Sequence, residues 1–110
     1  MKERFAIARI EEVPVGTGLK VEVAGHRIAL FRVGDDVYGI GDRCSHAEAS
    51  LSEGELFDEM VECPRHGSEF DVTTGTPHSL PATQPVPVYE IIRQDGDLYV
   101  EVEPIDEEDR

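Results

Sequence analysis

Each of the two cysteines in this 110-residue chain has a histidine close behind it, and this pairing limits the possible folds most strongly. Cys44 is followed by His46 and Cys63 by His66, with sixteen residues between the two pairs. An extended segment turns Cys44 and His46 to the same side, and a tight turn over residues 63–67 brings the second pair together. The four side chains can close one metal site only if the fold holds two loops side by side.

The order of the four side chains bears on which metal they bind. Structural zinc also takes two cysteines and two histidines, but it usually groups like ligands, with both cysteines in one hairpin. Here each loop supplies one sulfur and one nitrogen. A two-iron cluster with thiolates on one iron and imidazoles on the other fits this order, because each loop then spans both irons. The order favours iron without deciding it. The simplest alternative to any metal site is that the two thiols are buried in the core and the two histidines are incidental.

Short β-type runs lie on both sides of this region, and no helix of convincing length is predicted. The runs cover residues 5–10, 19–24, 27–33, 36–40, 88–93 and 98–103. Turn sequences join them in pairs at residues 24–26 (AGH), 34–36 (GDD) and 94–97 (QDGD). Antiparallel hairpins follow from this pattern, so the predicted fold class is all-β.

The middle of the chain differs from its flanks in composition. Residues 42–84 are rich in glycine, proline, serine and acids and contain both cysteines. Loop-rich segments inserted in a β scaffold commonly carry function. We therefore expect one domain, with a scaffold over residues 1–41 and 85–103, a site-bearing subdomain over 42–84, and an acidic tail over 104–110.

The charge of the chain restricts its partners. Ten basic and 24 acidic residues give a formal net charge of −14, which disfavours nucleic acid and anionic membranes and favours a basic protein surface. We expect a cytoplasmic protein, since the sequence shows neither a signal peptide nor a membrane span. We also expect a monomer in solution. Several acids between the two pairs form either a solvated face or a docking surface: Glu53, Glu55, Asp58, Glu59 and Glu62.

The residues around the two pairs resemble a known family. "CSH" at 44–46 and "CPRHGSEFDVTTGTP" at 63–77 resemble the two cluster-binding loops of Rieske proteins. "LPATQPVPVYEI" at 80–91 is similar to the proline loop and return strand of Rieske-type ferredoxins. The resemblance is to small ferredoxins of ring-hydroxylating dioxygenases and to those encoded beside Suf iron–sulfur assembly genes in actinobacteria. It implies the Rieske iron–sulfur fold, in which antiparallel sheets carry an inserted, loop-rich cluster-binding subdomain, and a Rieske-type [2Fe-2S] cluster.

The resemblance also implies a role for each residue of the two loops. Cys44 and Cys63 would hold the inner iron, while His46 and His66 would hold the outer iron. Four further residues would surround the cluster. Gly67 would be a small residue whose backbone lies beside the cluster, and the Ser68 hydroxyl would either donate to a cluster sulfur or only cap the turn. Phe70 stands where high-potential relatives have a tyrosine, so its hydroxyl is missing. Pro81 would either shield the cluster or only end a loop.

Two features depart from the high-potential members of the family. Those proteins carry an extra disulfide, and here the matching positions hold Ala49 and Arg65. The missing disulfide and hydroxyl, with the acidic surroundings, predict a potential toward the low end of the Rieske range, nearer about −150 mV than +300 mV. The remaining histidines, His26 and His78, are expected at the surface rather than as ligands, since the four ligand positions are filled.

The function that follows is one-electron transfer, from a basic flavin-dependent reductase to an oxygenase or another acceptor. The chain has no room for the mononuclear iron domain of a full oxygenase, so we do not expect it to be an enzyme alone. Three alternatives use related features: an accessory factor in iron–sulfur cluster assembly, a small subunit of a nitrite-reductase-type enzyme, and a zinc-stabilised interaction module. The full ligand set disfavours the second of these.

Overall fold

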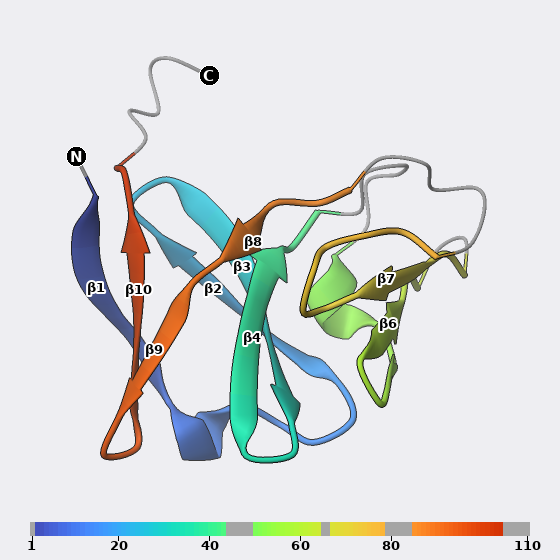
Figure 1. Ribbon diagram of the computed structural model, residues 1–110, viewed down its shortest axis with the longest axis horizontal. Helices are drawn as coiled ribbons and strands as arrows, with labels where there is room; N and C mark the ends of the chain where they lie inside the picture. Colours follow the sequence, from blue (N-terminus) through green and yellow to red (C-terminus); the bar gives the residue numbers. More distant parts are fainter. Residues whose placement is uncertain (1, 44–49, 65–66, 79–84, 105–110) are drawn as a thin grey trace.

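The computed structural model describes residues 2–43, 50–64, 67–78 and 85–104, and it is built mainly of β-strands, as predicted (Figure 1). One sheet has the order β1-β10-β9, with β1 at Glu3–Arg9, β9 at Ile91–Gln94 and β10 at Asp97–Val102. A second has the order β2-β3-β4-β8, with β2 at Gly18–Val23, β3 at His26–Val33, β4 at Asp36–Gly41 and β8 at Val88–Tyr89. A third, small sheet has the order β5-β6-β7, with β5 at Leu56–Phe57, β6 at Met60–Glu62 and β7 at Glu69–Asp71.

All described strand pairs are antiparallel, and the predicted turns lie where the sequence placed them. Ala24 and Gly25 connect β2 to β3, and both have positive φ, at 51° and 87°. Asp95 and Gly96 connect β9 to β10 with φ of 52° and 93°. Two-residue turns with positive φ match the twist of antiparallel strands, so these residues fix the register of their hairpins.

None of the helices in the described ranges is long and apolar enough to cross a bilayer.

Strand β3 separates two hydrophobic cores. Ile28 and Leu30 face the first core, which fills the space between the two larger sheets with Leu98 and its neighbours on β10. Ala29 and Phe31 point to the opposite side and pack with the third sheet. All four of these β3 side chains are fully buried. Because successive side chains of a strand alternate between faces, this run of apolar residues supports both cores at once.

The structure differs from the sequence-based prediction at the return segment. Residues 88–93 were expected to form one strand, but they form β8 and β9, which belong to different sheets. β8 pairs with β4 through Tyr89 and Val88, whereas β9 pairs with β10. Apolar residues lie on both sides of Glu90, so the sequence pattern does not show that the chain passes from one sheet to the other at this residue. Two 3-10 helices, η1 (Ile10–Glu12) and η2 (Leu51–Glu53), were also not predicted.

His26 is not a plain surface residue, contrary to the prediction. Its ring is partly buried and meets the Tyr89 ring edge-on, with ring centroids 5.4 Å apart. The Nε2 atom lies 2.7 Å from the carbonyl oxygen of Glu103, which can only accept, so Nε2 carries the proton. In a neutral ring Nδ1 is then the acceptor, and the Tyr89 hydroxyl donates to it over 3.1 Å. His26 thus connects β8 to the end of β10.

We expect Tyr89→Phe to lower the free energy of unfolding by about 1 kcal/mol at neutral pH, because it removes this hydrogen bond. Burial raises the pKa of Tyr89 above its ordinary value of about 10. The contribution of the neutral phenol is therefore complete below pH 10 and is lost as the pH rises through the higher folded pKa. Urea denaturation of both proteins at pH 8 and above pH 10 measures the difference, which should shrink on the alkaline side. A difference that stays constant would contradict the assignment.

Candidate metal centre

Of the four predicted ligands, the described residues include one. Cys63 follows β6 directly, and its side chain is 1% exposed. Cys44, His46 and His66 lie outside the described residues, as does Pro81. Within the described ranges, no three histidine, cysteine or acidic side chains come close enough together to hold a metal ion. The described part of the site consists of Cys63 and the ends of the two ligand loops.

The second ligand loop is a tight turn between β6 and β7. The Cys63 amide donates to the Ser68 carbonyl over 2.7 Å, and the Gly67 amide donates to the Cys63 carbonyl over 2.9 Å. These bonds extend the ladder that pairs Glu62 with Glu69. Gly67 has a φ of +71°, a backbone conformation that favours glycine. The loop is therefore short and hydrogen-bonded at its base, as the sequence predicted for this turn.

The first ligand loop is closed at its base as well. It leaves the second sheet after β4 and returns at η2, and an isolated antiparallel bridge pairs Arg43 with Ser50. The Leu51 amide also donates to the Asp42 carbonyl over 2.6 Å. The six residues between Arg43 and Ser50 include two of the predicted ligands. Both ligand loops thus start and end at hydrogen-bonded positions of the chain.

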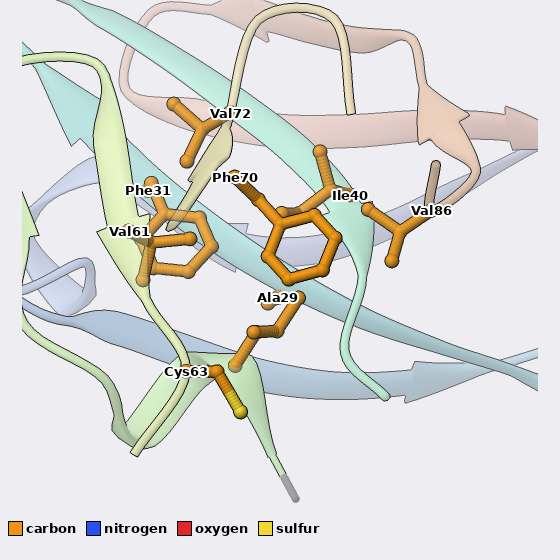
Figure 2. Packing of buried hydrophobic residues seen from close by; sticks show 9 residues of the cluster. Ala29, Phe31, Ile40, Val61, Cys63, Phe70, Val72 and Val86 are labelled. Atoms are coloured by element: carbon orange, nitrogen blue, oxygen red, sulfur yellow. The ribbon is translucent and has the colours of Figure 1, made fainter. Parts of the chain in front are cut away.

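One hydrophobic core supports the bases of both loops. Leu51, next to the first loop, and Cys63 and Phe70, on either side of the second, belong to the same buried cluster. Figure 2 shows the Phe70 ring among the apolar side chains and Cys63 at their edge, with its sulfur pointing away from that ring. A buried thiol at the edge of a core, beside a turn that carries a histidine in its sequence, is a suitable donor for an iron–sulfur cluster.

The remaining residues predicted around the site are placed only in part. Ser68 is fully buried, and its carbonyl accepts the bond that closes the turn. Phe70 is fully buried and pairs with Val61 across the third sheet, so its ring packs in the core. The predicted effects of Ser68 and Phe70 on the potential stay predictions. His78 is exposed, in agreement with the sequence analysis.

Among the described residues, the acids between the two pairs are all exposed: Glu53, Glu55, Asp58, Glu59 and Glu62. Glu53, Glu55 and Glu62 line a shallow pocket of about 290 Å³, together with Gly54 and Pro64. Two of the lining residues, Glu62 and Pro64, flank Cys63 in the sequence. The negative surface therefore reaches the base of the second ligand loop.

Gly75 was noted in the sequence only as part of the family motif, and its contact with the return segment was not predicted. Its amide donates to the Asp71 carbonyl over 2.7 Å, and its carbonyl accepts from the Val86 amide over 2.9 Å. A Cβ at this position would lie 2.3 Å from the Val86 carbonyl oxygen, and its φ is +74°. Only glycine fits this close approach. Nothing in the local sequence shows that the return segment, which lies about ten residues further along, passes so near.

Comparisons with known proteins agree with this architecture. A family model described as a Rieske [2Fe-2S] domain matches residues 3–90. The chain is 43% identical, over 90% of its length and 93% of the relative, to the ferredoxin subunit of 3-phenylpropionate/cinnamic acid dioxygenase of Escherichia coli K12.

Two solved structures extend this comparison. The chain is 35% identical to the ferredoxin of carbazole 1,9a-dioxygenase from Nocardioides aromaticivorans IC177, with a TM-score of 0.84 and coverage of 88% of this chain and 95% of that one. A structure of reduced oxygenase with oxidized ferredoxin of carbazole 1,9a-dioxygenase matches at 39% identity and a TM-score of 0.83, covering 94% of this chain and 97% of that one.

Gly75→Ala should destabilise the protein by clearly more than Gly34→Ala. Both glycines have positive φ, at 74° and 62°, so both variants bear the strain of alanine in that region, about 1–3 kcal/mol. Gly34 has no neighbour within 4 Å of an added Cβ, whereas Gly75 meets backbone. Urea denaturation gives the two losses, and hydrogen exchange should show the excess at Val86 and Asp71. Equal losses of stability in the two variants would mean that the backbone near Gly75 moves away from an added Cβ without cost.

Proposed function

The chain belongs to the Rieske [2Fe-2S] domain family, and from this premise we propose that it is the one-electron carrier of a dioxygenase system. The observation that carries the proposal is the pair of ligand loops closed at the base over one core, with a buried Cys63 beside the second loop. The relative from Escherichia coli is named as a ferredoxin subunit, an electron-transfer component rather than a catalytic one. No substrate has to bind for such a role.

We propose Cys44 and Cys63 as the thiolate ligands and His46 and His66 as the imidazole ligands of the cluster. When bound, a [2Fe-2S] cluster of this kind accepts and releases one electron. The protein contributes the placement of the ligands: the Cys63 thiol lies at the edge of the core, and the turn to Ser68 fixes its backbone. Residues 42–84 would form the cluster-binding subdomain, which contains η2 and the third sheet.

The acceptor we propose is an oxygenase, and the donor a flavin-dependent reductase with a basic docking surface. A similar ferredoxin has been solved in complex with its oxygenase in carbazole 1,9a-dioxygenase. The net charge of −14 and the exposed acids near Cys63 suit a basic partner, because opposite charges steer association. The names of the relatives favour this role over one in cluster assembly.

Replacing any proposed ligand should remove the cluster. We expect Cys63→Ser and His46→Ala to lose the visible spectrum of the cluster and most of the iron, and to be less stable, because metal binding contributes to folding. His78→Ala is the matched control, since His78 is an exposed histidine outside the ligand set and its variant should keep both. Iron analysis and visible absorption measure this. A Cys63→Ser protein with full iron content, or a colourless wild type with one zinc per chain, would refute the assignment.

Reduction by a cognate reductase should slow as salt increases, because surface charges are screened beyond a Debye length of about 8 Å at physiological ionic strength. The double variant Glu53→Gln/Glu55→Gln should reduce both the rate at low salt and the steepness of this dependence. The control, Asp35→Asn/Asp95→Asn, removes the same charge at the distal hairpin turns after β3 and β9, and should change less. Stopped-flow kinetics measures both. Identical salt responses in the two doubles would leave the acids as a general solubility feature.

A further inference from the structure

Asp42 is a buried carboxylate at the base of the first ligand loop. Its exposed fraction is 4%. The Ser50 hydroxyl lies 2.7 Å from Oδ1 and 2.6 Å from Oδ2, and the Ser52 amide donates to Oδ1 over 3.0 Å. The Ser52 hydroxyl in turn lies 2.7 Å from the Ser50 hydroxyl.

The hydroxyl protons of this group can form a chain that ends at the carboxylate. A carboxylate only accepts, so the single Ser50 proton goes to Asp42, and the Ser52 hydroxyl is then the donor to Ser50. The Ser52 amide is a second donor to the carboxylate oxygens. The described polar surroundings of the Asp42 carboxylate therefore consist of donors, which suits a side chain that only accepts.

A negative charge is not needed merely to close this loop. The bridge between Arg43 and Ser50 and the bond from Leu51 to the Asp42 carbonyl already close it through backbone groups. An asparagine could also meet both serines, because the Ser50 hydroxyl can accept from an amide and donate to Ser52 instead. Burying a charge is costly, so its presence here points to a role that a neutral side chain would not fill.

We propose that Asp42 sets the reduction potential of the cluster, as a fixed negative charge beside the first ligand loop. This rests on the proposed function, with Cys44 as a ligand. Asp42 and Cys44 are two residues apart, so their Cα atoms are at most about 7 Å apart. A buried charge at such range acts with little screening, whereas the exposed acids are screened by water and salt. A nearby anion opposes the added electron and lowers the potential.

The test compares three variants by protein-film voltammetry. Asp42→Asn should raise the equilibrium constant for one-electron reduction by about tenfold, which corresponds to about 59 mV. Ser50→Ala keeps the charge but removes a donor that offsets it, so it should lower that constant by about two- to threefold. Asp95→Asn removes one exposed charge from the turn between β9 and β10 and should leave it unchanged. Asparagine also tolerates the positive φ at that position.

The opposite signs separate an electrostatic role from a structural one. If Asp42 only held the loop in place, both the Asp42 and Ser50 variants would loosen it and shift the potential in the same direction. Shifts of one sign, or no shift in an Asp42→Asn protein with full iron content, would overturn the inference. If that variant does not retain the cluster, Ser52→Ala supplies the test, because it leaves the charge in place and should also lower the potential. A wild type without a cluster would instead refute the proposed function.

Discussion

Strand β3 is the element on which the rest of the structure depends, because it is buried on both faces. Ile28 and Leu30 complete the core between the larger sheets, and Ala29 and Phe31 complete the core beneath the ligand loops. Large apolar side chains each contribute about 1.5–3 kcal/mol when buried. The two cores share a backbone, so the ligand loops rest on the scaffold through one rigid strand. Precise placement of a redox site benefits from such a support.

The scaffold strands were predictable because local chemistry specifies them. Residues alternate between apolar and polar in β2 and β10, which predicts the strands. The glycine-containing turns after Val23 and Gln94 predict that neighbouring strands pair as hairpins. The sheet of β5, β6 and β7 was missed because its strands are two or three residues long, too short to show a period. Those strands exist through tertiary contacts, such as the amide of Leu56 donating to the carbonyl of Gly16.

The candidate site shows the same division between local and long-range information. The two Cys/His pairs and the tight turn at Cys63 were evident from spacing and from family resemblance. The partners of Asp42 and the contacts of His26 were not, since they join residues 8 to 77 positions apart. A histidine in a hairpin turn carries no mark in the sequence of the carbonyl it will meet. Buried polar groups of this kind are visible only once the fold brings their partners together.

The pairing of β1 with β10 has a consequence for the order of folding. Glu3 lies opposite Val102, so this sheet closes a loop that contains nearly the whole chain. Contacts of such sequence separation form slowly, whereas the hairpins of β2, β3 and β4 are local. A cluster bound by the proposed ligands would cross-link residues 44–46 to 63–66 and so shorten that loop, which lowers the entropy cost of its closure. Cofactor insertion and closure of the terminal strands would then assist one another kinetically.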